Sequence, residues 1–393
     1  LIFSAFARNQ RMTTTANWSL RCSACDTEAA LQGASLCGAC GQPLFARYET
    51  VPKGTPLASR WDMWRYTPFM PLLAGEAPVS LGEGLTPLIE SVDHAAAVGV
   101  RKLFIKDEAQ NPTGSFKARG MSAAVTRAKG AGVPGIVVPT AGNAGAALAA
   151  YGAAAGLKVR VYAPKTTPRP ILDTIEAFGA ELIRIDGHIG DAGKLSLAYA
   201  AESGFFPIST LREPYRVEGM KTMGFELAEQ FGWRVPDVVV YPTGGGEGTV
   251  GIWKALLELS AGGWLHEERV QPQYVVAQAA GCAPIARAYA AGAEKAEPWV
   301  DPVTYASGLR VPSPLGDRLV LRILRETNGV AGTASEEAIR EWTYRLASAT
   351  GVDAAPEDGC ALAVLRDAVA AGKVSADAEV VVFNTGAGDS YRA

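Results

Sequence analysis

The chain has 393 residues, of which 48% are hydrophobic, and a formal net charge of −3 at pH 7. This length allows two or three domains around a large buried core. The mild negative charge gives no electrostatic reason to expect a nucleic-acid partner. No run approaches the roughly eighteen apolar residues that a membrane span needs, so we expect no membrane partner either.

The first eleven residues precede Met12 and lack the charged and then apolar order of a secretory signal peptide. We therefore expect residues 1–11 to be upstream or added sequence, and we take a cytoplasmic protein as the default.

Four of the six cysteines form two Cys-x-x-Cys pairs separated by eleven residues. They are Cys22, Cys25, Cys37 and Cys40. Paired knuckles of this kind place four thiolates around one zinc ion, and such a site has no open position for chemistry. We expect a structural zinc in a zinc-ribbon-like segment over residues 12–60. Disulfides are the alternative, which the missing signal peptide disfavours.

Short apolar runs alternate with Ala-rich helical stretches along the rest of the chain. The strand candidates are residues 103–105, 136–139, 159–163, 182–185, 238–240, 274–277 and 380–383. This alternation is typical of parallel sheets in an α/β fold. Ligands of such sheets bind at the carboxyl ends of the strands.

One lysine follows the first of these runs, at the start of a predicted helix. Lys117 ends the stretch Asn-Pro-Thr-Gly-Ser-Phe-Lys of residues 111–117. A rigid turn that opens a buried helix can hold an uncharged amine as a nucleophile. A lone lysine is more often a solvated helix residue, but two glycine-rich loops downstream reverse that balance.

The two loops each lie between an apolar run and a helix. The first reads Pro-Thr-Ala-Gly-Asn-Ala-Gly-Ala (139–146), and the second reads Thr-Gly-Gly-Gly-Glu-Gly-Thr (243–249). Bare backbone N–H groups suit a carboxylate at the first loop and a phosphate at the second. Neither loop has the signature of a nucleoside triphosphate or dinucleotide site. A reactive lysine with these two loops fits pyridoxal phosphate.

Five motifs, in this order, resemble the threonine synthase family. They are residues 111–117, 141–145, 218–222 (Glu-Gly-Met-Lys-Thr), 243–246 and 384–388 (Asn-Thr-Gly-Ala-Gly). The resemblance runs from about Leu81 to Tyr391. It implies fold type II of the pyridoxal-phosphate enzymes, which threonine dehydratase and the tryptophan synthase β subunit share, and a homodimer.

The resemblance also implies how the domains are arranged. A large cofactor-binding domain would comprise residues 61–119 and 211–393, and a small domain of residues 120–210 would be inserted into it. The cofactor would lie in the cleft between the two parallel-sheet domains, and closure of that cleft would exclude water.

Cofactor-binding roles follow from the same resemblance. Lys117 would carry the cofactor and then move protons as a base, and Asn143 would bind the phenolic oxygen. Thr385 would meet the pyridine nitrogen, and a hydroxyl there does not hold that nitrogen protonated. Phe116 would pack near the ring, or simply in the core. The phosphate nest would comprise Gly244, Gly245, Gly246, Glu247 and Gly248.

Substrate roles are implied for a second group of residues. Thr140, Ala141 and Ala144 would line the loop that holds the amino-acid carboxylate. Ala144 stands where threonine synthases often carry a hydroxyl, so one candidate hydrogen bond to a substrate phosphate is missing.

Three basic residues are candidates for the substrate phosphate. Arg216 and Lys221 either bind it or belong to a solvated helix face, paired to Glu218 or Glu226. Arg310, in the run Ser-Gly-Leu-Arg, is a weaker candidate. The ending Asp-Ser-Tyr at residues 389–391 departs from the family pattern and leaves the wall beside Thr385 undefined.

The implied reaction converts O-phospho-L-homoserine and water to L-threonine and phosphate. The alternatives are a threonine or serine dehydratase and a β-replacement enzyme that uses O-phosphoserine, similar to cysteate synthase. A zinc-ribbon binding protein with an inactive body is a further alternative, against which Lys117, Asn143 and Thr385 argue. No serine elbow or paired catalytic carboxylates support a hydrolase.

Overall fold

The computed structural model of the chain describes residues 17–31, 33 and 35–392. Residues 1–11, and residues 12–16 of the expected cysteine segment, lie outside the described residues. The described chain forms three sheets of six, four and three strands. The predicted mixed α/β class with parallel sheets is confirmed.

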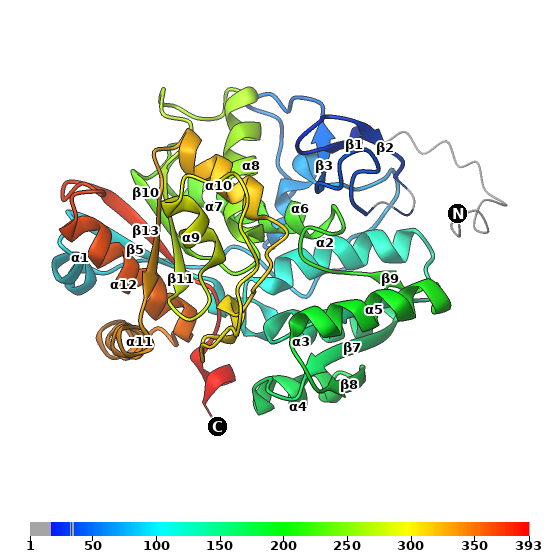
Figure 1. The fold of residues 1–393 in the computed structure, drawn as a ribbon. Coiled ribbons are helices and arrows are strands. Elements are labelled where there is room, and N and C mark those ends of the chain that lie inside the picture. The colour runs from blue at the N-terminus through cyan, green and yellow to red at the C-terminus, as the bar shows by residue number, and fades with distance from the viewer. Residues whose placement is uncertain (1–16, 32, 34, 393) are drawn as a thin grey trace.

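The large sheet has the strand order β12-β11-β10-β13-β5-β4 (Figure 1). In chain order its strands are β4 (Leu88–Glu90), β5 (Lys102–Asp107), β10 (Val238–Pro242), β11 (Gln273–Ala279), β12 (Val330–Ala334) and β13 (Glu379–Asn384). All neighbours pair in parallel except β4, which runs antiparallel to β5 at the edge. The sequence did not predict β4, because its three partly exposed residues give no apolar run.

Successive residues of the inner strand β13 point to opposite faces of this sheet. Val380 and Val382 join one apolar cluster, whereas Val381 and Phe383 join another. The helices of the first cluster are α1 (Val92–Val98), α11 (Glu336–Thr350) and α12 (Pro356–Ala370). Those of the second include α7 (Thr222–Gln230), α8 (Glu247–Ala261), α9 (Pro284–Ala290) and α10 (Asp317–Glu326). Because both faces are covered, the inner strands contain continuous apolar runs, such as residues 238–240 of β10 and 380–383 of β13, which made them predictable.

The four-stranded sheet has the order β8-β7-β6-β9, and its strands are all parallel. Its strands are β6 (Gly135–Pro139), β7 (Lys158–Pro164), β8 (Glu181–Ile185) and β9 (Phe206–Pro207). Helices α2 (Lys117–Gly130), α3 (Asn143–Ala155) and α4 (Arg169–Ala177) pack on one face, and α5 (Ile189–Ser203) packs on the other. All four strands fall within residues 120–210, which we keep as the proposed bounds of a small domain.

The cysteine segment forms a small antiparallel sheet. Its strands are β1 (Trp18–Cys22), β2 (Glu28–Ala29) and β3 (Leu44–Tyr48), with β1 in the middle. Its inward side chains join the apolar cluster that contains α2. The sheet therefore packs on the body of the molecule, beside α2 and the short helix α6 (Arg216–Met220) (Figure 1). In the part of the chain that the structure describes, no helix has the length and apolar character to cross a membrane.

Candidate active site

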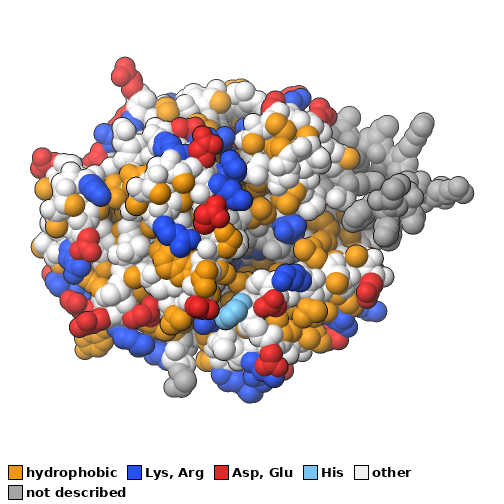
Figure 2. Space-filling view, viewed as in Figure 1, with side chains coloured by type: hydrophobic (Ala, Val, Ile, Leu, Met, Phe, Trp, Pro, Cys, Tyr) orange, Lys and Arg blue, Asp and Glu red, His pale blue; other side chains and the backbone are white. Residues whose placement is uncertain are grey.

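A cavity of about 420 Å³ lies at the carboxyl ends of strands from both parallel sheets. Asn143 follows β6, Gly244 follows β10 and Thr385 follows β13, and all three line the cavity. Figure 2 shows a hollow on this face with Lys and Arg side chains near it. The cavity therefore lies at the strand ends, where the sequence analysis expects the ligand.

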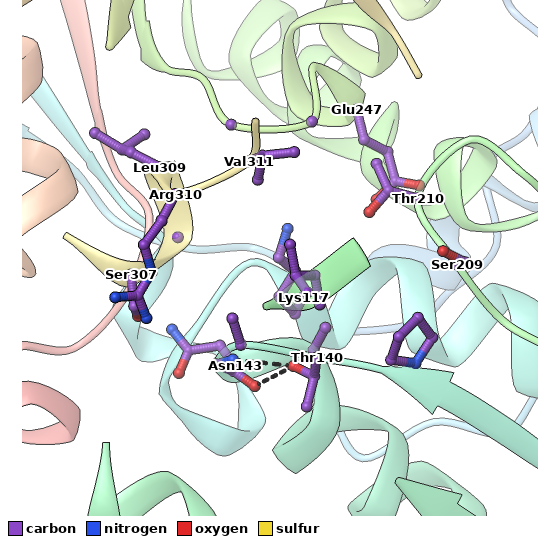
Figure 3. A pocket seen from close by; sticks show the side chains of 18 of the residues that line it. Lys117, Thr140, Asn143, Ser209, Thr210, Glu247, Ser307, Leu309, Arg310 and Val311 are labelled. Carbon is purple, nitrogen blue, oxygen red and sulfur yellow. Dashed lines mark hydrogen bonds between the residues drawn. The ribbon is translucent and has the colours of Figure 1, made fainter. Parts of the chain in front are cut away.

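Most of the predicted site residues meet in this cavity. Its lining includes Phe116, Lys117, Thr140, Ala141, Asn143, Ala144, Arg216, Gly244, Gly245, Gly246, Glu247, Gly248, Arg310 and Thr385. Figure 3 shows Lys117 between Asn143 and Thr140 on one side and the loop that ends at Glu247 on the other. Lys221 does not line the cavity.

Lys117 is the first residue of α2, and its amine lies 4.0 Å from the centre of the Phe116 ring. That ring also meets Tyr241 edge to face at 5.9 Å, so Phe116 both lines the cavity and belongs to the core. Burial, with a contribution from Arg216, lowers the pKa of Lys117 to about 8, although Glu247 and Glu357 oppose the shift. An amine with this pKa is partly uncharged near neutral pH, as a nucleophile requires.

The turn before Lys117 is tied to the strand that ends at Thr385. Thr113 and Gly114 both have positive φ, which reverses the chain just before the helix. Ala387 N donates to Gly114 O at 2.8 Å, and Phe116 N donates to Thr385 O at 3.1 Å. Lys117 and Thr385 are therefore held on one continuous wall of the cavity.

The loop of residues 244–246 is open because it has no side chains. A Cβ on Gly244 would lie 2.3 Å from Gly308 O, and one on Gly245 would lie 2.7 Å from the Thr210 side chain. Gly246 caps α8 with a φ of +88°. The bare N–H groups at the start of this helix form a cradle that a side chain would fill, which is the geometry of a phosphate site.

The second loop is stabilised by its own hydroxyl. Thr140 Oγ1 accepts hydrogen bonds from Gly142 N at 3.0 Å and from Gly145 N at 3.1 Å. Asn143 and Ala144 then begin α3 on the cavity wall. Thr140 thus shapes the loop, while the helix start supplies the positive end that attracts a carboxylate.

Arg216 lies at the base of the cavity with 1% of its surface exposed. Its Nη2 donates to Glu247 Oε2 at 2.8 Å, and its Nε is buried without a hydrogen-bond partner. The solvated-face alternative is therefore wrong for Arg216, because the residue is buried against Glu247. Glu247 uses its carboxylate for this ion pair, and Arg216 lines the cavity together with the glycine-rich loop.

Lys221 belongs to a different cluster. Its Nζ lies 2.6 Å from Glu218 and 3.0 Å from Glu258, and 3.8 Å from the centre of the Tyr48 ring. Burial lowers the pKa of Lys221 to about 8, although the two carboxylates favour its charged form. Since this amine is buried between α6, α8 and the cysteine segment, we do not retain Lys221 as a phosphate partner.

Arg310 connects the two sides of the cavity. It follows the short turn η5 (Ser307–Leu309), and its Nη2 lies 3.4 Å from Thr166 Oγ1, in the loop after β7. It is partly buried and lines the cavity. Its position suits either an anion or the closure of the two sides over a ligand.

Sequence reasoning missed two acidic residues at the start of α12, Glu357 and Asp358. Glu357 lines the cavity, and its Oε1 accepts from Gly308 N at 2.7 Å and from Tyr391 Oη at 2.8 Å. Its Oε2 is buried without a partner, and burial raises the pKa of Glu357. Asp358 hydrogen-bonds to Thr385. Acidic residues in a first helical turn are so common that neither carried a functional signal.

Comparison with known proteins shows the family to which this chain belongs. Residues 79–386 match the family model of pyridoxal-phosphate dependent enzymes. The chain is 34% identical over 327 residues to the threonine synthase of Methanosarcina acetivorans, covering 83% of this chain and 79% of that protein. The chain belongs to the threonine synthase family. The Methanocaldococcus jannaschii member of the family is 33% identical, with 83% and 80% covered.

The fold of this family member is also found in more distant enzymes. Maize serine racemase superposes with a TM-score of 0.66 at 23% sequence identity, covering 77% of this chain and 88% of that chain. At this identity the likeness shows the fold alone. It agrees with the mixed α/β architecture and its parallel sheets.

The cavity fits pyridoxal phosphate, the cofactor of these enzymes. Lys117 offers an amine for the aldehyde, and the cradle of residues 244–246 fits the phosphate. Asn143 and Thr385 would face the polar atoms of the ring. The donor set of the pocket therefore matches each reactive or polar group of the cofactor.

The four cysteines of the N-terminal sheet meet at one point. All four Sγ atoms lie within 4.8 Å of one another, and three of the Sγ–Sγ separations are 3.3, 3.5 and 3.7 Å. Zinc–sulfur bonds of about 2.3 Å in a tetrahedron require Sγ–Sγ separations of about 3.8 Å. The cluster therefore fits a four-thiolate metal site.

Proposed function

We propose that this enzyme is a threonine synthase that converts O-phospho-L-homoserine and water to L-threonine and phosphate. The observation that carries the substrate assignment is Arg216, a buried basic residue that lines the cavity beside a separate phosphate cradle and whose Nε has no hydrogen-bond partner. A substrate that carries a phosphate of its own, in addition to the phosphate of the cofactor, would give Arg216 an anion to bind. This would be favourable, since an unsatisfied buried donor is costly.

Bound pyridoxal phosphate supplies an electron sink that acidifies the carbon atoms of the amino acid attached to it. The residues of this chain do the rest. Lys117, with a pKa of about 8, takes and returns protons at the substrate Cα. The start of α3 at Asn143 and Ala144 holds the substrate carboxylate. Arg216 holds the substrate phosphate until it leaves from Cγ.

Further assignments complete the proposal. We assign the chain to the tryptophan-synthase-β-like form of fold type II, with a large domain of residues 61–119 and 211–393. The cysteine segment would be a zinc-ribbon-like module that holds a structural zinc. The active enzyme would be a homodimer in the cytoplasm. The separate four-stranded sheet of residues 135–207 supports the division into domains, and the cysteine cluster supports the zinc assignment.

The test offers O-phosphohomoserine, O-phosphoserine and threonine separately to the loaded enzyme and identifies the products. We expect threonine and phosphate from O-phosphohomoserine. Formation of 2-oxobutanoate from threonine without phosphate release from O-phosphohomoserine would instead establish a dehydratase. Ala144, which lacks the hydroxyl common in this family, is the feature that makes the dehydratase outcome worth testing.

A variant tests the role of Arg216 directly. Arg216→Lys keeps a positive charge beside Glu247 but removes the Nε donor. Loss of one charge-assisted hydrogen bond of roughly 1.5 to 3 kcal/mol should lower kcat/KM for O-phosphohomoserine by about ten- to a hundredfold. Cofactor affinity, measured by titration of the apo-enzyme, should not change. Equal kcat/KM in the variant and the wild type would contradict the assignment.

A further inference from the structure

A buried carboxyl group lies directly behind the hydroxyl of Thr385. Asp358, in the first turn of α12, has no exposed surface. Its Oδ1 accepts from Thr385 N at 2.8 Å and lies 3.0 Å from Thr385 Oγ1. Its Oδ2 accepts from Ala355 N at 3.0 Å. The two backbone bonds fix both oxygens, so the carboxyl group cannot turn away from the hydroxyl.

Among the described residues, Asp358 has no basic side chain as an ion-pair partner. The titratable groups that interact with it include Glu357 and Cys360 of its own helix, Tyr241 of β10 and Tyr391 of the C-terminal turn η6 (Gly388–Tyr391). None of these is a cation, and among the described residues no Lys, Arg or His forms a salt bridge with it. A buried carboxylate in such a place needs a proton or a positive partner.

The hydroxyl of Thr385 can be oriented in two ways, and each assigns a different proton position. In the neutral arrangement Asp358 keeps its proton and donates it to Thr385 Oγ1, which then donates its own proton into the cavity. In the charged arrangement the hydroxyl donates to the Asp358 carboxylate and accepts from a donor in the cavity. The second follows from the first when one proton moves from Oδ1 to Oγ1 and another moves from Oγ1 to the ligand atom.

We propose that Asp358 is a positioning residue that acts through the Thr385 hydroxyl to hold the ring nitrogen of the bound cofactor protonated. This inference rests on the proposed function, in which Thr385 meets that nitrogen. The protonated nitrogen then serves as the missing cation for Asp358, and the pair is neutral as a whole. A threonine at this position would otherwise leave the nitrogen unprotonated, as the sequence led us to expect.

The pKa of Asp358 in the protein without cofactor agrees with the neutral arrangement. Burial raises the pKa of Asp358 well above its usual range, although its hydrogen bonds to Thr385 and Ala355 oppose the shift. Burial thus favours the protonated carboxyl group in the free protein, which is the neutral arrangement described above.

The test follows the protonation of the cofactor nitrogen, without any amino-acid substrate. Wild type, Asp358→Asn, Thr385→Val and Thr385→Ser are loaded with pyridoxal phosphate carrying ¹⁵N in the ring, and the ¹⁵N chemical shift is recorded against pH. The pH at which half of the ring nitrogen has lost its proton should be higher in the wild type than in Asp358→Asn by about one unit or more. Thr385→Val should behave like Asp358→Asn, and Thr385→Ser should behave like the wild type.

Two controls separate this effect from a change of fold. Asp353→Asn removes a carboxylate that pairs with Arg392 near the same turn but does not touch Thr385, and it should leave the titration unchanged. Thermal unfolding of each apo-protein reports structural damage. Thr385→Val keeps the Asp358 carboxyl group and the backbone bond to it, so it tests the relay even if Asp358→Asn folds poorly.

The inference is overturned if the wild-type nitrogen is unprotonated at neutral pH, or if Thr385→Val titrates like the wild type. A different amino-acid substrate would change the proposed reaction but not this titration, so the two failures are distinguishable. Failure of the wild type to bind pyridoxal phosphate would overturn both.

Discussion

At the scale of single residues, the structure explains why Lys117 can be reactive. Its amine is enclosed by the cavity wall, and burial is the largest cause of its lowered pKa of about 8. Arg216 adds to the shift, while Glu247 and Glu357 reduce it. The carboxylate of Glu247 also forms an ion pair with Arg216, so it stabilises the charged form of Lys117 only in part. The position of the lysine in the fold, more than any one neighbour, therefore sets its reactivity.

Capture of the cofactor by the apo-enzyme should therefore depend on pH with a midpoint near 8. The lowered pKa means that the amine is charged below this pH and neutral above it, so the rate of covalent attachment should rise through pH 8 and then level off. The measurement mixes apo-enzyme with pyridoxal phosphate at each pH, reduces with borohydride and quantifies the labelled peptide.

A second lysine on the cavity wall provides the matched control. Lys194 of α5 also lines the cavity, but its side chain is largely exposed. Lys117→Ala should abolish labelling, whereas Lys194→Ala should leave its rate and pH dependence unchanged. Label on any lysine other than Lys117 would refute the assignment of the nucleophile.

At the scale of elements, a buried ion cluster holds α2 in place. Arg119, two residues after Lys117, donates to Glu108 at 2.6 and 2.8 Å and to Glu226 at 2.8 Å. Lys106 of β5 adds a bond to Glu226 at 3.0 Å. Although burial opposes it, Arg119 and Lys106 lower the pKa of Glu226 to about 2. The cluster joins α2 to β5 and α7, so it anchors the helix that begins at Lys117.

Removal of Arg119 should destabilise the fold strongly. Arg119→Ala would leave the buried carboxylates of Glu108 and Glu226 without their main partner, at a cost of roughly 3 to 5 kcal/mol in the free energy of unfolding. The exposed pair of Arg169 and Asp173 on α4 is the control, and Arg169→Ala should cost only about 0.3 to 0.5 kcal/mol. Urea denaturation measures both, and similar losses in the two variants would contradict the role of the cluster.

At the scale of the whole molecule, buried charges join the cysteine segment to the body. Glu218 of α6 accepts from Tyr48 Oη at 2.8 Å and from Ala46 N at 3.3 Å, both on β3. The same carboxylate pairs with Lys221 and Lys254. Two elements of the body and one strand of the segment thus share a single buried cluster, which explains why Lys221 lies away from the cavity.

The cysteine cluster should hold about one zinc per chain in the purified protein. Cys37→Ser should release the metal and increase hydrogen exchange in β1–β3, because a segment this small lacks a core of its own. Cofactor binding should survive, since none of the four cysteines lines the cavity. Cys282→Ser, which changes a buried thiol elsewhere, should retain the metal. Disulfides among the four thiols, with no bound zinc, would disprove the site.

The sequence alone determined seven strands of the two parallel sheets, the two glycine-rich loops and the position of Lys117, but not β1–β4, β9 or β12. Strands covered on both faces must be apolar at each position, as in residues 380–383. The cradle has no room for a side chain at Gly244, so the loop must be rich in glycine, which is visible in the sequence. Each of these features depends on a constraint that acts within a short stretch of chain, so a few consecutive residues are enough to indicate it.

Only the tertiary structure decided which charged residues belong to the site. Asp358 and Thr385 are 27 residues apart in the chain, and no local pattern shows that they share a hydrogen bond. Arg216 and Lys221 lie five residues apart, yet Arg216 reaches the cavity while Lys221 pairs with Glu218 and Glu258. A charged side chain takes its role from its nearest partners in space, because electrostatic energy depends on distance and burial rather than on sequence separation.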